Sequence, residues 1–143
     1  MRIHQISVFL ENRAGQLAEL TDLLAGNGIN LRAISVAETA DYGLVRLIVD
    51  DYKKAADILT AHGDMISVNR VWVAAVPDEP AGLAKLLQVL AQGHVNVSYM
   101  YSLFTHGSGC AYMVLRISDE AAFLKATENS DIRLVGAAEL GIV

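Results

Sequence analysis

The chain has 143 residues, of which 53% are hydrophobic and 19% are charged, and its formal net charge is −5 at pH 7. That length suits one ordinary domain or two modules of about 70 residues. The composition argues against a disordered segment. The acidic balance argues against a protein that holds nucleic acid through clustered Lys and Arg.

The N-terminal residues alternate apolar and polar side chains, as a half-buried strand does, and lack the apolar core and cleavage site of a signal peptide. No run approaches the roughly 18 apolar residues that cross a bilayer. The single cysteine, Cys110, cannot form an internal disulfide, and a lone thiol is ordinary in a reducing cytosol. We expect a soluble, cytoplasmic protein without a membrane or nucleic-acid partner.

The first half of the chain predicts strand, helix, strand, strand, helix and strand. A strand is expected over Ile3–Leu10, and a helix follows whose apolar face is formed by Leu17, Leu20, Leu23 and Leu24. Gly26, Asn27 and Gly28 suit a helix C-cap. Strands are expected at residues 29–39, 44–49 and 67–71, with a turn at 41–43 and a second helix over Tyr52–His62, capped by Asp50 or Asp51.

The second half predicts the same series. A strand at residues 71–76 leads through the loop 77–80 to a helix that carries Leu83, Leu86, Leu87 and Leu90. Strands follow near residues 95–104 and 110–117, and a helix near 119–128. Only Asn69 and Arg70 separate the last strand of the first series from the second series, so we expect two modules packed side by side.

An internal repeat explains this recurrence. When Leu17 is aligned with Leu83, the same register, without a gap, pairs identical residues along the chain. They are Ala18 and Ala84, Leu20 and Leu86, Leu24 and Leu90, Ala25 and Ala91, Asn30 and Asn96, Thr39 and Thr105, and Gly43 and Gly109. A short insertion in the second copy then aligns Asp50 with Ser118.

The repeat predicts an α+β protein with two tandem modules, residues 1–70 and 71–143. The order βαββαβ gives each module a ferredoxin-like antiparallel sheet with both helices on one face. Two such sheets that share an edge would form an eight-stranded sheet.

The loops of both copies resemble those of the ACT domain family, regulatory modules that bind amino acids. The family pattern is a strand, then Asp/Asn-x-Pro-Gly, a Leu-rich helix, and Gly-hydrophobic-Asn-hydrophobic at the next strand. Residues 11–17 (ENRAGQL) with 28–31 (GINL) fit it, and residues 77–83 (PDEPAGL) with 94–97 (HVNV) fit it again. Ala14 stands where the family usually has Pro, and Ala81 stands where Gly is usual, although Gly82 follows.

The resemblance implies a ligand site at each of these loops. Gly15 allows a ligand to approach the backbone, and the amides of residues 14–17 open a helix whose positive dipole end favours a carboxylate. Asn12 can donate to that carboxylate or accept from an ammonium. The implied ligand-binding residues in the loops are Asn12, Ala14, Gly15, Gln16, Leu17, Asp78, Ala81, Gly82 and Leu83.

The resemblance also implies that the second wall of each site comes from a neighbouring module. Asn96 and Val97 would face the first loop, and Asn30 and Leu31 would face the second. A purely structural interpretation stays open, in which the glycines only allow strand-to-helix turns and the asparagines only close helix-to-strand turns.

Other sites are less favoured by the sequence. The histidines His4, His62, His94 and His106, with Cys110, lack the dense spacing of a metal site. No catalytic motif is found. Tyr99, Met100, Tyr101 and Phe104 could form an RNA-binding aromatic patch, but basic residues do not accompany them, so Tyr99 and Tyr101 are interpreted as packing residues on one strand face.

We therefore expect a non-catalytic regulatory or sensor protein without a metal or cofactor, which binds an amino acid between ACT-like modules. We also expect a homodimer, with a metabolic enzyme as a possible partner. The alternative is a structural interaction module that pairs with a metabolic enzyme and binds no small ligand.

Overall fold

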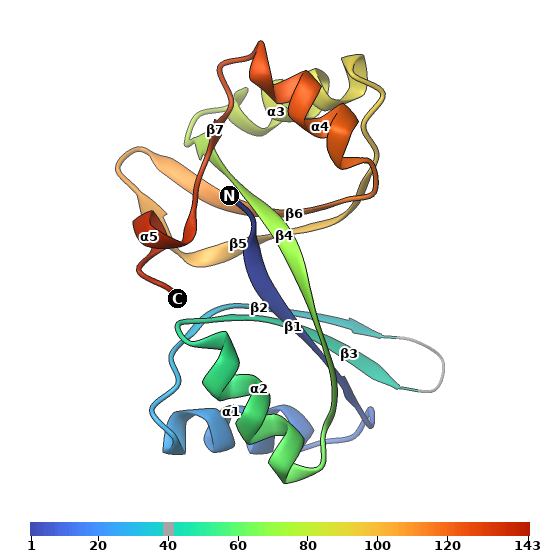
Figure 1. The fold of residues 1–143 in the computed structure, drawn as a ribbon, viewed down its shortest axis with the longest axis vertical. Coiled ribbons are helices and arrows are strands. Elements are labelled where there is room, and N and C mark those ends of the chain that lie inside the picture. Colours follow the sequence, from blue (N-terminus) through green and yellow to red (C-terminus); the bar gives the residue numbers. More distant parts are fainter. Residues whose placement is uncertain (39–41) are drawn as a thin grey trace. The chain divides into compact units, whose positions relative to one another are not determined.

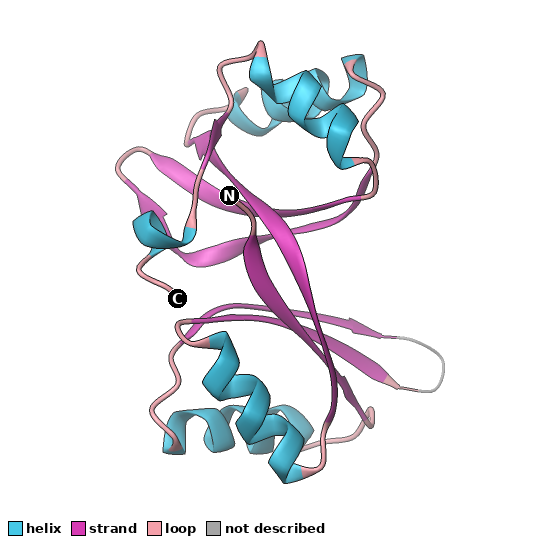
Figure 2. Cartoon of the chain, in the orientation of Figure 1, coloured by secondary structure: helices cyan, strands magenta, loops and turns pink. Residues whose placement is uncertain are grey.

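The structure is a computed structural model that describes residues 1–38 and 42–143 (Figure 1). The chain divides into two compact units. The first unit contains His4–Arg70 together with Gly141–Val143, and the second contains Val71–Leu140 together with Met1–Ile3. In both units the strands form a sheet that two helices cover (Figure 2).

The first unit has the predicted order of elements. They are β1 (Ile3–Leu10), α1 (Gln16–Gly26), β2 (Leu31–Glu38), β3 (Gly43–Val49), α2 (Tyr52–His62) and the beginning of β4 (Met65–Pro77). The sheet order is β2-β3-β1-β4. Strand β3 is antiparallel to both of its neighbours, β1 and β2.

The second unit repeats this plan. The remainder of β4 is followed by α3 (Gly82–Gln92), β5 (Val97–Gly107), β6 (Cys110–Ile117), α4 (Glu120–Glu128), β7 (Arg133–Leu134) and the short α5 (Ala137–Leu140). Strand β6 is antiparallel to β4 and β5, and β7 pairs with β4. The predicted βαββαβ order and the antiparallel sheets are therefore confirmed in both units.

The short link predicted between the last strand of the first copy and the first strand of the second is not present. Residues 65–77 form one continuous strand, β4, in which Asn69 and Arg70 are interior positions. No Gly occurs in this segment, and its only Pro is the last residue, so nothing in its backbone chemistry interrupts an extended conformation. The side-by-side packing of the modules stays a prediction.

Both strands that follow the first helix of a copy begin later than predicted. The amide of Ile29 donates to the Leu24 carbonyl at 3.0 Å, and the amide of Val95 donates to the Leu90 carbonyl at 2.8 Å. These bonds close the helix ends, so each residue belongs to the helix terminus and the strand starts two residues later. The predicted turn at 41–43 includes residue 41, which lies outside the described residues.

Each unit buries one face of its sheet under its helices. In the first unit Ile6, Val8 and Leu47 pack against Leu24 of α1 and Leu59 of α2. In the second, Phe123 of α4 is fully buried, and its ring lies 5.0 Å from that of Trp72 on β4. The predicted helix faces are only partly buried. Leu17, Leu83 and Leu87 remain exposed, whereas Leu20, Leu24, Leu86 and Leu90 are in the cores.

The second helix of each copy begins with the same cap. The Asp51 carboxylate accepts from the Lys54 amide at 3.2 Å, and the Asp119 carboxylate accepts from the Ala122 amide at 3.0 Å. Of the two capping candidates, Asp51 is thus correct. The Asp50 carboxylate instead accepts from the Asn30 amide at 3.0 Å.

None of the helices in the described part of the chain combines the length and the apolarity that a membrane crossing needs.

The core of the second unit supplies a stability test. Phe123→Ala should lower the free energy of unfolding by about 3 to 5 kcal/mol, because it removes a fully buried ring and leaves a cavity beside Trp72. The neighbour Leu124 is 47% exposed, so Leu124→Ala should cost less than about 1 kcal/mol. Urea denaturation followed by the fluorescence of the single Trp measures both. Equal losses for the two variants would contradict the assignment of Phe123 to the core.

Candidate functional site

The first loop, residues 11–15, leads from β1 into α1 through an unusual backbone. Gly15, the N-cap residue, has φ 87°, in the left-handed region, and a Cβ built there would meet nothing within 4 Å. Among the described residues no side chain caps the first amides of α1. The Gln16 amide donates to the Arg13 carbonyl at 3.4 Å, so the described amides that remain available to an anion at this helix start are those of Leu17 and Ala18.

Polar side chains surround this helix start. The Asn12 side chain donates to the Glu38 carboxylate at 3.2 Å, and Arg13 donates to the Glu11 carboxylate at 2.8 Å. When the Gln16 amide turns its oxygen to Arg13, that oxygen accepts from the guanidinium at 3.1 and 2.6 Å. Except for the half-buried Gln16, the residues 12–17 are exposed.

The second loop differs from the first in its backbone. Ala81 is the N-cap residue of α3, with φ −98°, and Gly82 is already helical and buried. A Cβ on Gly82 would lie 2.0 Å from the Pro77 carbonyl oxygen. Gly82 is therefore required for close packing against its own loop, while Asp78, Ala81 and Leu83 are exposed around it.

The other predicted site residues, Asn30, Leu31, Asn96 and Val97, lie at the opposite ends of the strands in each sheet. In the first unit, Leu10 at the end of β1 and Glu38 at the end of β2 both pair with Gly43, whereas Leu31 pairs with Val49 at the other end of β3. In the second unit, Pro77 and Gly107 both pair with Cys110, and Val97 pairs with Ile117. Asn30 and Asn96, just before β2 and β5, thus lie far along the sheet from the loop of their own unit.

A cavity of about 340 Å³ borders the first loop on its helix side. It is lined by Glu11, Arg13 and Gln16 from the loop and the helix start, and by Glu19, His62 and Asp64 farther along. A cavity of about 370 Å³ occupies the same place in the second unit. In the repeat register Gln16 and Glu19 correspond to Gly82 and Lys85. With Asp51 aligned on Asp119, His62 and Asp64 correspond to Ser130 and Ile132, and all four second-unit residues line that cavity.

The two cavities therefore share a position in the fold but differ in chemistry. The ionisable residues that line the first are Glu11, Arg13, Glu19, His62 and Asp64, whereas those that line the second are Lys85 and Asp131. The sequence did not single out Glu11, Arg13, Glu19, Glu38 or Asp64. Only the alignment of the two copies could have pointed to these five residues, because it shows that the second copy has other residue types at their positions.

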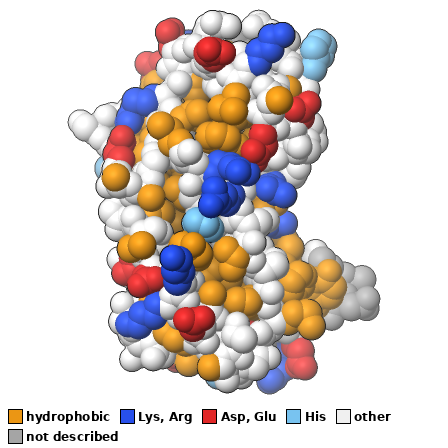
Figure 3. Space-filling view, viewed as in Figure 1, with side chains coloured by type: hydrophobic (Ala, Val, Ile, Leu, Met, Phe, Trp, Pro, Cys, Tyr) orange, Lys and Arg blue, Asp and Glu red, His pale blue; other side chains and the backbone are white. Residues whose placement is uncertain are grey.

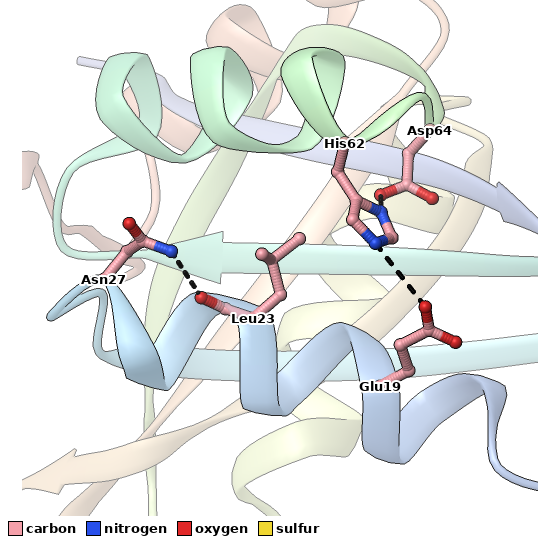
Figure 4. Close-up of polar contacts among 5 residues, drawn as sticks. All are labelled: Glu19, Leu23, Asn27, His62 and Asp64. Atoms are coloured by element: carbon pink, nitrogen blue, oxygen red, sulfur yellow. Dashed lines mark hydrogen bonds and ion pairs between the residues drawn. The ribbon is translucent and has the colours of Figure 1, made fainter.

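His62, beside the first cavity, contacts two carboxylates (Figure 4). Its Nδ1 lies 2.9 Å from an Asp64 carboxylate oxygen, and its Nε2 lies 3.4 Å from a Glu19 carboxylate oxygen. The hydrogen bond to Asp64 raises the pKa of His62 above its usual range, and the charges of Asp64 and Glu19 add to this increase.

The remaining sequence candidates are not gathered into a site. In the described part of the chain, no three His, Cys, Asp or Glu side chains are grouped as a metal ion would require. Cys110 is half-buried. Tyr99 and Tyr101 stack with ring centroids 6.4 Å apart, which confirms that they share a strand face. On the face shown in Figure 3, both basic and acidic side chains occur, separated by apolar and uncharged surface.

Comparison with known proteins identifies the repeated module. A family model described as the ACT domain pair matches residues 1–129. The chain belongs to the ACT domain family. The match covers both ACT modules and ends just after α4.

Solved structures share the fold of this chain. Protein BT0572 from Bacteroides thetaiotaomicron is 34% identical, with a TM-score of 0.89 over 100% of this chain and 98% of that chain. The ligand-free regulatory subunit of aspartate kinase from Thermus thermophilus is 20% identical, with a TM-score of 0.62 over 87% of this chain and 90% of that chain. The second likeness shows the shared fold alone.

A shorter sequence match links part of the chain to part of another protein. The acetolactate synthase small subunit of Aquifex aeolicus (strain VF5) is 38% identical over 50 residues, or 35% of this chain. The matched segment spans 26% of that protein's length.

The contrast between the two ACT loops leads to a second stability test. Gly82→Ala should lower the free energy of unfolding by about 1 to 3 kcal/mol, because the new methyl group would collide with the Pro77 carbonyl. Gly26→Ala, in α1 with no atom within 4 Å of the new Cβ, should be neutral or stabilising by up to about 1 kcal/mol, because Ala favours helix. Chemical denaturation followed by circular dichroism tests both. A neutral Gly82→Ala variant would show that the second loop is not closely packed.

Proposed function

We propose that this ACT domain pair is a non-catalytic regulatory protein that binds a free amino acid at the loop of its first unit. The observation that carries the proposal is the left-handed Gly15, which leaves open space at a helix start that no described side chain caps. Membership of the ACT family supports it. So does the sequence match to a protein named as an acetolactate synthase small subunit.

The loop has complementary groups for both charges of an amino acid. Amides at the start of α1 and the positive end of the helix dipole favour the carboxylate. On the other side of Asn12, the exposed Glu38 carboxylate can accept hydrogen bonds from the ammonium. The exposed Leu17 offers an apolar contact for the ligand's side chain. This arrangement should favour an amino acid over a carboxylic acid of the same shape that lacks the ammonium.

The second loop is the weaker candidate. Asp78, Ala81 and Leu83 are exposed there, but the space at Gly82 is filled by the Pro77 carbonyl, and Ala81 does not adopt the left-handed backbone of Gly15. We therefore assign the amino acid to the first loop.

The missing wall of the site would come from another ACT module. In each unit the second strand begins at the end of the sheet opposite to the loop. The residues at this end are Asn30 and Leu31 in the first unit and Asn96 and Val97 in the second. A ligand held by both kinds of residue therefore requires two modules, and we propose that a homodimer brings them together. Strand β5, at an edge of its sheet, contains no Lys, Arg, Asp or Glu that would oppose pairing with another strand.

A thermal-shift screen against the twenty common amino acids tests the ligand proposal. A ligand at about 100 times its Kd should stabilise the protein by about 2.7 kcal/mol. An amino acid that stabilises should do so more than its analogue without the amino group. If no amino acid stabilises the protein, the alternative of a structural module that pairs with a metabolic enzyme and binds no small ligand is favoured.

The role of Asn12 is tested by calorimetry with each amino acid that stabilises in this screen. Asn12→Ala should weaken binding by about 1 to 3 kcal/mol, because it removes a side chain that bonds the ligand and positions Glu38. Asn27→Ala is the matched control, because Asn27 donates to the Leu23 carbonyl at the other end of α1, at 2.8 Å. An affinity that is unchanged in Asn12→Ala would remove Asn12 from the site.

The homodimer is tested by sedimentation equilibrium. The full chain, of 15.4 kDa, should sediment with twice that mass, and a screened amino acid should strengthen the association if it bridges modules of two copies. A single-chain mass at every concentration, with and without the amino acid, would contradict the dimer.

A further inference from the structure

His62 ties the start of α1 to the opposite side of the first cavity. It is the last residue of α2, and its ring reaches from that helix across to Glu19 of α1 while it also contacts Asp64, just before β4 (Figure 4). Glu19 lies in the first turn of α1, where its amide donates to the Gly15 carbonyl at 3.0 Å. The contact between His62 and Glu19 therefore restrains α1 within one turn of the amides that we propose bind the ligand's carboxylate.

The other end of α1 is fixed independently. The Asn27 side chain donates to the Leu23 carbonyl at 2.8 Å, and the amides of Asn27, Gly28 and Ile29 close the last turn on Leu24 and Ala25. The two ends of α1 therefore differ. The C-terminal end is closed by uncharged bonds, while contacts between ionisable side chains restrain the N-terminal end.

Both contacts of His62 depend on its protonation. A protonated imidazole donates from both ring nitrogens, so it can serve Asp64 and Glu19 at once, whereas a neutral ring donates from only one. The other charged groups on this cavity are Glu11 and Arg13 of the loop, which bond each other at 2.8 Å. The residues of β1 and β4 that line it are Phe9, Leu10 and Met65, which do not titrate.

We propose that His62, when protonated, is a positioning residue that clasps α1 through Glu19 and holds the first loop ready for its amino acid, so that ligand binding in the first unit depends on pH. The ligand half of this proposal rests on the proposed function, but the clasp does not. The second unit has no equivalent, because Lys85, Ser130 and Ile132 stand at the positions of Glu19, His62 and Asp64.

The sign of the pH effect follows from the protonated clasp. Since Asp64 raises the pKa of His62, the clasp is complete below the ordinary histidine pKa of about 6.5 and is lost as the pH rises through the higher folded value. The three side chains are 38%, 58% and 16% exposed in the order His62, Glu19 and Asp64. Solvent screening therefore limits the effect to about two- to fivefold.

Nuclear magnetic resonance of the full chain without ligand tests the clasp. Between about pH 6 and pH 8.5, the amide shifts of Glu19 and Leu20 should titrate with the same midpoint as the His62 ring. Their protection from hydrogen exchange, corrected for intrinsic rates, should fall about two- to fivefold over this range. His4 stacks on Tyr52 at 3.8 Å, and its pKa is lowered by burial and then by Arg70 and Lys53, so its ring should titrate at a lower pH than that of His62.

Three variants separate the clasp from a merely structural role. Glu19→Gln should abolish the titration of the α1 amides while the His62 midpoint stays raised, because Asp64 is the larger cause of the shift. Asp64→Asn should lower that midpoint more than Glu19→Gln does. His62→Lys places a cation at this position throughout the pH range, so the α1 amides should keep their protection from hydrogen exchange at every pH. His106→Gln, an exposed histidine of the second unit, is the matched control and should change nothing in α1.

The ligand half is tested with the amino acids that stabilise the protein in the screen. For each chain, the ratio of the Kd at about pH 8.5 to the Kd at about pH 6 is measured. This ratio should be about two to five times larger for the natural chain than for His62→Lys. Amides of α1 that titrate equally in Glu19→Gln, or that do not titrate at all, would overturn the clasp even if an amino acid binds. If the clasp titrates and no amino acid binds, only the proposed function fails.

Discussion

The pairing of β3 with β1 on one side and β2 on the other determines where each candidate site residue lies. Because both neighbours are antiparallel to β3, they are parallel to each other and end at the same edge of the sheet. The loop after β1 and Glu38 at the end of β2 therefore meet, although they are far apart in the sequence. The same geometry sends Asn30 to the opposite edge, so a single ACT module cannot assemble the whole site that the family resemblance implies.

The two loops show how one fold can tolerate different local solutions. Both connect a central strand to a helix of eleven residues. In the first unit, the left-handed Gly15 turns the chain outside the helix and leaves space. In the second, the turn uses Ala81 in an ordinary conformation, and the helix start moves against the Pro77 carbonyl, where only Gly82 fits. The hydrophobic cores beneath the helices are not affected, because Leu20 and Leu24 in one unit and Leu86 and Leu90 in the other are buried alike.

The sequence was sufficient for the fold because the features that define it are local or periodic. The bounds of β1, α2 and β6 were predicted from apolar spacing and capping residues, and the repeat supplied the order of elements. It was not sufficient for the strand β4, because Asn69 and Arg70 are compatible with either a link or a strand. It also gave no position for β7 and α5, which are too short for a periodic signal.

The candidate site was predicted only where it is contiguous in the sequence. Residues 12–17 form one loop, so a motif could identify them. Glu38 contacts Asn12 across the sheet, and His62 contacts Glu19 across two helices, and such pairs depend on strand order and helix packing. The sequence did not place His62 in the site, because its partners Glu19 and Asp64 share no motif spacing with it.

The internal duplication offers a way to judge which of these contacts are required by the fold and which are specific to one unit. The caps Asp51 and Asp119, and the helix closures at Ile29 and Val95, occur in both copies, so they belong to the folding of an ACT module. The open glycine, the Asn12 contact with Glu38 and the histidine clasp occur in the first copy, where replacement by Ala81, Asp78 and Ser130 in the second leaves the sheet and its helices intact. Contacts that the fold can lose without changing its architecture are those that a binding function would have to maintain, and in the described chain they gather around one helix start.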